Sequence, residues 1–176
     1  MISTDFAGHK TLVVGGTSGI GHAVARMVLE NGGSVVVTGR RSDSTAAATG
    51  DLAAFGDVFG DTADLAHDDE QKALVSRLNE KHPDIDRLVN AAGLFLPKPF
   101  LEHTEADYDQ YLDLNRSMFF ITQAVAKNMV ASGRGGAIVN IGSMWAKQAV
   151  QATPSSAYSM AKAGLHSLTQ HLVDEI

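Results

Sequence analysis

The feature that most constrains the fold is the alternation of short apolar runs with longer segments of helical periodicity. Residues 10–16 (KTLVVGG) form a continuous apolar run that ends in glycines, which is typical of a parallel strand buried on both faces. Residues 20–33 carry apolar side chains at helical spacing and stop at a pair of glycines. Residues 34–39 (SVVVTG) then predict a second buried strand.

The same alternation continues to the end of the sequence. Strand and helix that follow one another with connections this long favour parallel pairing through right-handed crossovers, with helices on both faces of the sheet. We therefore predict a doubly wound α/β fold with three layers and about five strands, built from residues 1–176 as one domain. The remaining predicted elements are a weaker strand within 57–65, a polar helix at 67–82, a strand at 86–93, two helical stretches over about 104–131, a strand at 135–143 and a last helix from about 155; residues 40–54 are left unassigned.

Composition and charge argue against several kinds of partner. The net charge is −6, and a nucleic-acid-binding surface needs a basic patch, so we expect no nucleic-acid partner. No apolar run approaches the roughly 18 residues of a membrane helix, and the first residues lack the basic and apolar regions of a signal peptide. There is no cysteine, and the seven histidines form no HExxH-type ligand set, so no metal site is expected. We expect a soluble cytoplasmic protein that binds no membrane.

A glycine-rich turn, GGTSGIG at residues 15–21, joins the first strand to the first helix. Gly15 permits the tight turn, Gly19 lets a pyrophosphate approach the backbone, and Gly21 allows close packing of helix on sheet. The free N–H groups of the helix N-terminus attract an anion. The spacing differs from both the common dinucleotide fingerprint and a Walker loop, so a turn without a ligand remains the alternative. The cofactor-binding residues expected here are Gly15, Thr17, Ser18, Gly19, Ile20 and Gly21.

The end of the second predicted strand indicates which cofactor is bound. A site for NAD usually has an acidic residue there, which hydrogen-bonds the ribose 2′-hydroxyl. This sequence has Arg40 and Arg41 instead, and guanidinium groups bind a 2′-phosphate through charge-assisted hydrogen bonds. We therefore expect NADP(H) to be preferred over NAD(H). Two solvated surface arginines are the alternative interpretation.

A tyrosine and a lysine one helical turn apart form the candidate catalytic pair. Tyr158 and Lys162 have this spacing, which is weak evidence alone. Ser143 ends the fifth predicted strand, and Asn90 and Gly93 lie at the end of the fourth. Because an open parallel sheet binds its ligands beyond the carboxyl ends of the strands, we expect these residues to share one crevice.

Six short segments follow one another along the sequence: GGTSGIG (15–21), ADL (63–65), NAAG (90–93), LNRS (114–117), IGS (141–143) and YSMAK (158–162). Taken together and in this order, they resemble the motifs of the short-chain dehydrogenase/reductase family over essentially the whole sequence. The resemblance implies a Rossmann-like fold, a homo-oligomer, and an oxidoreductase that transfers hydride between NADP(H) and a small carbonyl or alcohol substrate without a metal.

The resemblance implies a role for each catalytic residue. Tyr158 would be the general acid toward a carbonyl oxygen, or the base in the reverse direction. An isolated tyrosine has a pKa near 10, so the positive charge of Lys162 would stabilise its phenolate, and Lys162 would also hold the nicotinamide ribose. Ser143 would hydrogen-bond the substrate oxygen. Asn115 would hold a water molecule that links Lys162 to solvent.

The resemblance also implies further contacts to the cofactor. Asp64 would bond the adenine amino group, and Leu65 would line that pocket. Asn90 would secure the segment beside the cofactor. The expected cofactor-binding residues are therefore those of the glycine-rich turn named above, together with Arg40, Arg41, Asp64, Leu65, Asn90, Ala91, Gly93, Tyr158 and Lys162.

Several departures from the family pattern leave the function open. Val14 replaces a usual threonine, Ala91 is a variant within NAAG, and the segment between Ser143 and Tyr158 is longer than usual. The sequence ends at Ile176, whereas family members continue through two further strands and a substrate-covering segment. A hydrophobic edge strand left bare would invite pairing with another chain. The alternative to an active oxidoreductase is therefore a truncated or catalytically silent dinucleotide-binding protein.

Overall fold

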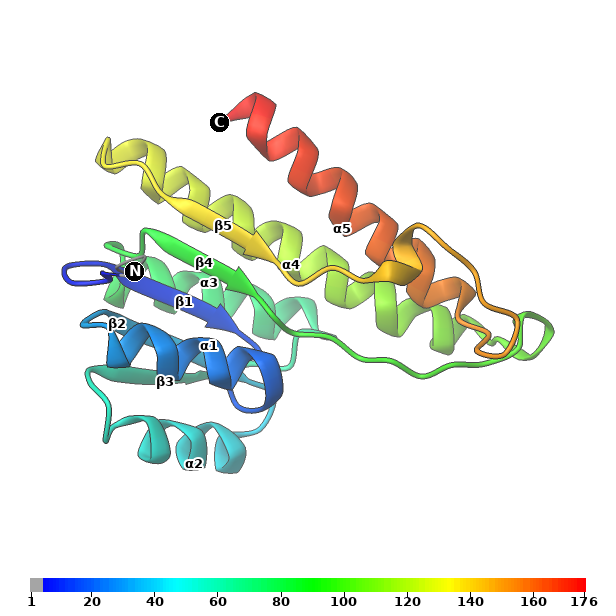
Figure 1. The fold of residues 1–176 in the computed structure, drawn as a ribbon, viewed down its shortest axis with the longest axis horizontal. Coiled ribbons are helices and arrows are strands. Elements are labelled where there is room, and N and C mark those ends of the chain that lie inside the picture. Colours follow the sequence, from blue (N-terminus) through cyan, green and yellow to red (C-terminus); the bar gives the residue numbers. More distant parts are fainter. Residues whose placement is uncertain (1–4) are drawn as a thin grey trace.

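Five parallel strands form one sheet in the order β3-β2-β1-β4-β5 in the computed structural model, which describes residues 5–176 (Figure 1). Along the chain, β2 and β3 are added on one side of β1, whereas β4 and β5 are added on its other side. The direction in which strands are added therefore reverses between β1 and β4. This topological switch point creates a crevice at the carboxyl ends of the strands. The Rossmann-like doubly wound fold predicted from the sequence is confirmed. The strands are β1 (Lys10–Val14), β2 (Ser34–Gly39), β3 (Val58–Thr62), β4 (Arg87–Asn90) and β5 (Ala137–Asn140).

The helices differ from the sequence-based expectation in two places. The unassigned segment 40–54 contains a helix, α2. The two stretches predicted over 104–131 are one continuous helix, α4, because its 28 residues contain neither glycine nor proline. The helices are α1 (Gly19–Glu30), α2 (Ser42–Leu52), α3 (Asp68–Lys81), α4 (Glu105–Ser132) and α5 (Ser156–Glu175), with short 3₁₀ helices η1 (Phe100–Glu102) and η2 (Met144–Ala146).

The two ends of α4 are defined by local chemistry. Thr104 accepts a hydrogen bond from the backbone N–H of Asp107, and the Asp107 carboxylate accepts one from the backbone N–H of Thr104. This capping box satisfies donors that the first turn would otherwise leave free. Gly133 ends the helix in the left-handed conformation, at φ 64°. None of the helices within residues 5–176 combines the length and the apolar character needed to span a membrane.

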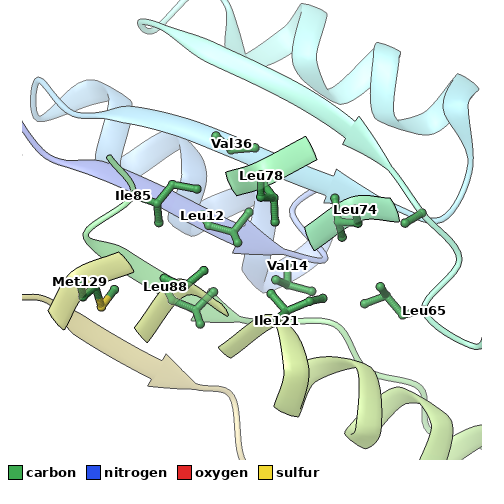
Figure 2. Close-up of a cluster of buried hydrophobic side chains, with 12 residues drawn as sticks. Leu12, Val14, Val36, Leu65, Leu74, Leu78, Ile85, Leu88, Ile121 and Met129 are labelled. Carbon is green, nitrogen blue, oxygen red and sulfur yellow. The ribbon is translucent and has the colours of Figure 1, made fainter. Parts of the chain in front are cut away.

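Side chains alternate between the two faces of the sheet and build two cores. Leu12 and Val14 of β1 pack with α3 and α4, as Figure 2 shows for the first core. Val13 points to the opposite face and packs with α1 and α2. Because successive strand residues point to opposite faces, a run of consecutive apolar residues is required when both faces are covered. The continuous apolar runs of the sequence therefore specify the three layers.

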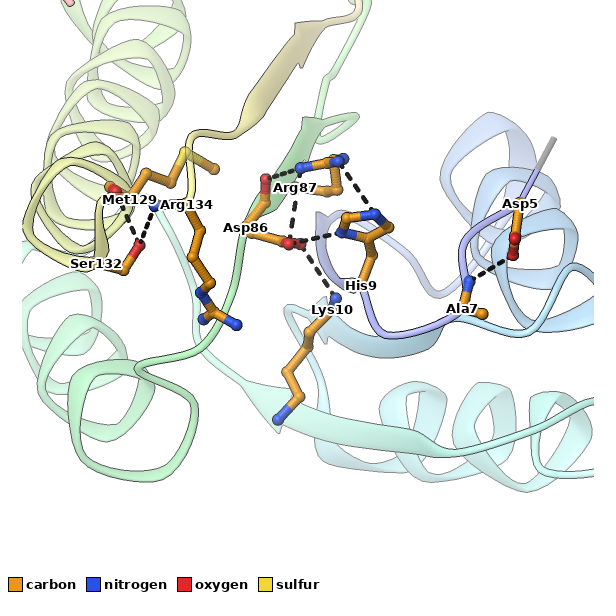
Figure 3. Close-up of polar contacts among 9 residues, drawn as sticks. All are labelled: Asp5, Ala7, His9, Lys10, Asp86, Arg87, Met129, Ser132 and Arg134. Carbon is orange, nitrogen blue, oxygen red and sulfur yellow. Dashed lines mark hydrogen bonds and ion pairs between the residues drawn. The ribbon is translucent and has the colours of Figure 1, made fainter.

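A polar cluster joins the amino ends of β1 and β4 (Figure 3). The crevice lies at the opposite, carboxyl ends of the strands. The Asp86 carboxylate accepts hydrogen bonds from His9 Nδ1 at 2.7 Å and from the backbone N–H of Lys10 at 3.2 Å. Arg87 lies beside it and donates to the Asp86 carbonyl oxygen at 2.8 Å. Asp86 is buried, and a buried carboxylate is tolerated when it is hydrogen-bonded in this way. The cluster fixes the pairing of the two central strands.

The outer edge of β5 is accessible. β5 is the last strand of the sheet, and Val139 in it is 50% exposed. A groove lined by Val130, Ile138, Leu172 and other residues runs between α4, β5 and α5. Within residues 5–176 no strand pairs with this edge, as the sequence led us to expect.

Candidate active site

The glycine-rich turn at the end of β1 depends on two close backbone approaches. Gly15 has φ 84°, and a Cβ built there would lie 2.6 Å from the Cα of Ala92. A Cβ built at Gly21 would lie 2.2 Å from the carbonyl oxygen of Gly15. The turn is also tied to β2, because the N–H of Gly16 donates to the carbonyl oxygen of Thr38 at 3.0 Å. Gly15 and Gly21 therefore let the turn lie flat against the ends of β1 and β4.

The N-terminus of α1 is open to an anion. Gly19 has φ 56°, and a Cβ built there would meet no atom within 4 Å. The preceding Ser18 makes no side-chain cap hydrogen bond, and the first turn of α1 contains no acidic residue. Ile20 is 62% exposed. Because the first N–H groups of a helix have no acceptor within the helix, these groups and the positive end of the helix dipole offer an anion-binding site beside exposed residues, which would fit the pyrophosphate of a dinucleotide.

The two arginines lie where the sequence predicted, directly after β2. Both side chains are exposed. Arg41 is the N-cap residue of α2, and its Nε donates to Asp43 at 3.1 Å. No ion pair of Arg40 is found within the described residues, so its guanidinium is available to a ligand. A Cβ built at Gly39 would lie 2.4 Å from Thr17 Cγ2, so the end of β2 touches the glycine-rich turn.

The segment after β3 is held by α3 and α4. The N–H of Asp64 donates to Glu70 Oε2 at 2.7 Å. The side-chain Oδ1 of Asp64 accepts a hydrogen bond from the N–H of Ala66 at 3.1 Å. Leu65 is buried, and its carbonyl oxygen accepts a hydrogen bond from the hydroxyl of Ser117 in α4 at 2.6 Å. These contacts fix Asp64 and Leu65 in a defined position beyond the strand.

The segment after β4 is anchored by Asn90. Its Nδ2 donates to Thr122 Oγ1 at 2.9 Å and to Asn140 Oδ1 at 2.8 Å. Asn90 is buried, and Ala91 packs into the core on the α1 and α2 face. The side chain of Asn90 thus links β4 to α4 and β5.

Lys162 is the most unusual charged group of the site. The residue is 8% exposed, and its Nζ donates to the carbonyl oxygen of Ile141 at 2.8 Å. Burial lowers the pKa of Lys162, because desolvation disfavours the ammonium form. The Nζ lies 5.9 Å from the centroid of the Tyr158 ring and 3.9 Å from a Cβ built at Gly93. The residues after β4 and β5 and the start of α5 therefore meet around one buried cation.

The ring of Tyr158 lies among other aromatic side chains. Its centroid is 4.8 Å from that of Phe95 and 5.9 Å from that of Tyr111. Phe95 in turn stacks on Trp145 at 6.3 Å. The hydroxyl of Tyr111 donates to the carbonyl oxygen of Leu96 at 3.1 Å and accepts from its N–H at 2.9 Å. Tyr111 packs in this cluster and also holds the loop that carries Phe95.

Ser143 and Asn115 reach the same region from different elements. Ser143 Oγ accepts a hydrogen bond from the N–H of Trp145 at 3.3 Å, which leaves the serine hydroxyl proton free to be donated. Asn115 Nδ2 donates to the carbonyl oxygen of Ala161 at 2.7 Å, one residue before Lys162. Asn115 therefore ties α4 to α5 beside the buried lysine.

The residues that hold these segments in place were not predicted from the sequence. Thr122 and Asn140 bind Asn90, and Ser117 binds the backbone of Leu65. Of these residues, only Ser117 lies within a motif segment, LNRS (114–117). The others act through contacts between elements distant in sequence, so no local spacing identifies them.

Comparison with known proteins identifies the class to which this site belongs. The sequence model of the family described as short chain dehydrogenase matches residues 9–176. This chain therefore belongs to the short-chain dehydrogenase family, as its motifs indicated.

Individual relatives share both sequence and structure with the chain. An oxidoreductase of Bacillus subtilis, YvrD, whose function is uncharacterised, is 36% identical over an alignment of 170 residues, which covers 93% of this chain and 61% of that protein. The 3-oxoacyl-[acyl-carrier-protein] reductase FabG of Chlamydia pneumoniae is 30% identical over 96% of this chain and 68% of its own length. The L-sorbose reductase of Gluconobacter frateurii, solved with NADPH and L-sorbose, superposes with a TM-score of 0.91 at 25% identity, over 99% of this chain and 66% of that one. The chain thus spans about two thirds of the length of these relatives.

Proposed function

We propose that the chain carries an NADP(H)-dependent oxidoreductase site that interconverts a carbonyl and an alcohol. The catalytic residues of this proposal are Ser143, Tyr158, Lys162 and Asn115. The observation that carries it is the buried Lys162, whose ammonium group lies beside the ring of Tyr158 and is held by the backbone two residues before Ser143. A buried cation one helical turn from a tyrosine is an arrangement that perturbs proton transfer.

The residues around the crevice fit a dinucleotide. When bound, NADP(H) would supply or accept the hydride. The open N-terminus of α1 would hold its pyrophosphate, and Asp64 and Leu65 would border its adenine. The exposed guanidinium of Arg40 supports a preference for the 2′-phosphate, with Arg41 beside it. The NADPH complex of the similar L-sorbose reductase is consistent with this preference.

The protein groups would manage the oxygen and its proton. Ser143 would donate its free hydroxyl proton to the substrate oxygen and stabilise the negative charge that develops there. Tyr158 would deliver a proton to that oxygen during reduction and remove it during oxidation. The ammonium group of Lys162 would favour the phenolate form of Tyr158 through its charge. Asn115 would keep α5 in place and connect Lys162 to solvent.

The substrate in this proposal is a small molecule with a carbonyl or alcohol group. A homo-oligomeric state and a cytoplasmic location stay predictions.

Turnover of NADPH by this chain with a panel of ketones tests the proposed function. Tyr158→Phe removes the proposed proton donor and is expected to lower kcat by about 10²- to 10⁴-fold while NADPH still binds. Tyr108→Phe is the matched control, because Tyr108 packs beside the same cluster without a proposed chemical role. A chain that binds NADPH but reduces no ketone would instead support the silent dinucleotide-binding protein.

The cofactor preference needs its own measurement. Arg40→Ala is expected to weaken NADPH binding by about tenfold or more and to leave NADH binding unchanged, because only NADPH carries the 2′-phosphate. Arg134→Ala, in the turn before β5, is the matched control for loss of one positive charge. Equal losses for the two cofactors would contradict the assignment of Arg40.

A further inference from the structure

One polar stripe along α5 fastens the helix to the segment that leaves β5. Lys162, His166 and Thr169 lie three or four residues apart and therefore share one face of α5. Each side chain on this stripe bonds a residue between 140 and 143. The three contacts are Lys162 Nζ to the Ile141 carbonyl oxygen at 2.8 Å, the Ser143 N–H to His166 Nε2 at 3.4 Å, and Asn140 Nδ2 to Thr169 Oγ1 at 2.8 Å.

The contact of His166 requires the glycine at position 142. A Cβ built at Gly142 would lie 2.2 Å from His166 Nε2, and its three nearest atoms all belong to the His166 ring. Any side chain at position 142 would thus displace the imidazole. The ring lies directly against the backbone of IGS (141–143), the motif that ends in Ser143.

The hydrogen bond defines the protonation of the ring. Because the N–H of Ser143 donates to Nε2, this nitrogen is unprotonated and the proton of the neutral imidazole is on Nδ1. The peptide of Ser143 is held by His166, and its hydroxyl oxygen accepts the N–H of Trp145. Backbone and side chain of the serine are thus both oriented by partners.

We propose that His166 is a positioning residue for Ser143. It would hold the serine at a fixed distance from Tyr158 and Lys162, because all three residues of the stripe and Tyr158 belong to the same helix. This inference rests on the proposed function, since Ser143 matters to turnover only if it binds the substrate oxygen. His166 touches backbone behind the serine and takes no part in the proton transfer itself.

The expected effect follows from the loss of one hydrogen bond at a residue that needs accurate placement. A neutral hydrogen bond contributes only modestly to stability, whereas misplaced catalytic groups lose activity steeply. We expect His166→Leu to lower kcat by about tenfold, with KM and the Kd of NADPH changed less than about twofold. His166→Gln should retain most of kcat, because its amide oxygen can accept the Ser143 N–H from a similar reach.

The first measurement addresses the contact without any catalysis. The ¹⁵N chemical shifts of the His166 ring in the labelled 176-residue chain should show an unprotonated Nε2 and a protonated Nδ1 at neutral pH. Gly142→Ala should change these shifts, because the new methyl group displaces the ring. A ring protonated on Nε2, or shifts that Gly142→Ala leaves unaltered, would overturn the proposal whatever the enzyme does.

The second measurement compares the two His166 variants with His171→Leu, an exposed histidine on the same helix. Losses of kcat that are equal for His166→Leu and His166→Gln would show a packing role and overturn the positioning role. His171→Leu should match the wild type. If instead Tyr158→Phe retains full turnover, or the wild type has none, the proposed function itself fails and the positioning role fails with it, while the ring shifts still report the contact.

Discussion

Replacement of Gly21 by alanine tests how the turn at the end of β1 is packed. The new Cβ would lie 2.2 Å from the carbonyl oxygen of Gly15, whereas ordinary contacts begin at 3.4 Å, so about 1 Å of separation is lacking. The oxygen has little room to retreat, because Gly15 is itself pressed against the backbone of Ala92. Overpacking of this kind costs about 1–3 kcal/mol, and the higher helix propensity of alanine offsets about 0.5–1 kcal/mol of it. Because the clash is with a backbone oxygen, the cost lies in the upper half of that range, and the offset leaves a net loss of about 1–2 kcal/mol in the free energy of unfolding.

Gly50 provides a matched control for the glycine-to-alanine change, because α2 covers the same face of the sheet as α1. It lies in α2, and a Cβ built there would meet no atom within 4 Å. Gly50→Ala should therefore stabilise the protein by about 0.5–1 kcal/mol through helix propensity alone. Thermal unfolding followed by far-UV circular dichroism should show Tm lowered by about 2–8 °C for Gly21→Ala and raised by about 1–4 °C for Gly50→Ala. Wild-type stability of Gly21→Ala would refute the packing argument.

Three further predictions concern charged groups. Asp86→Asn should lower the free energy of unfolding by about 1–3 kcal/mol in urea denaturation at pH 7, because an amide cannot accept both hydrogen bonds of the buried carboxylate. Burial makes the pKa of Lys162 lower in the folded than in the unfolded protein. The free energy of unfolding of the wild type should therefore rise with pH between the folded-state pKa and about 10.4, the pKa of an unperturbed lysine. Lys162→Met should lack this rise when urea denaturation is compared across the same pH range. The hydrogen bond from Lys98, together with those from the hydroxyl and N–H of Thr104, lowers the pKa of Asp107. The Asp107 carboxylate therefore stabilises the fold above about pH 3.9, the pKa of an unperturbed aspartate, and this stabilisation is lost as the pH falls below that value. Carboxyl ¹³C shifts should titrate below the ordinary range in the wild type and move toward it in Lys98→Met; an unchanged titration would contradict this cause.

Much of the fold was predictable because its signals are local. The continuous apolar runs around Leu12 and Val36 identified buried strands, and the glycine-rich turn identified the start of α1. The segment 40–54 was unassigned because its polar and alanine residues show little apolar periodicity, and α2 forms there by packing Leu52 against β2 and β3. The break expected within α4 was wrong, because contacts with the sheet and α5 keep the whole helix continuous.

Candidate site residues were identified by motif, and their grouping required the folded structure. Tyr158 and Lys162 are neighbours in any helix, so their pairing follows from spacing. The burial of Lys162 and its hydrogen bond to Ile141 depend on how α5 lies against the end of β5, which no local pattern encodes. The structural roles of Thr122 and His166 likewise arise only from packing between distant segments.

Local patterns in the amino-acid sequence specify the layered α/β architecture, the position of the glycine-rich turn and the types of the candidate catalytic residues. These features depend on periodicity, backbone conformation and residue chemistry, which act over a few neighbouring residues. Tertiary structure alone decided that Lys162 is a desolvated cation, that Gly21 has no room for a methyl group, and that His166 reaches the backbone of Ser143. Desolvation and close approach are properties of atoms brought together across the fold, so they exist only once the sheet and its helices have packed.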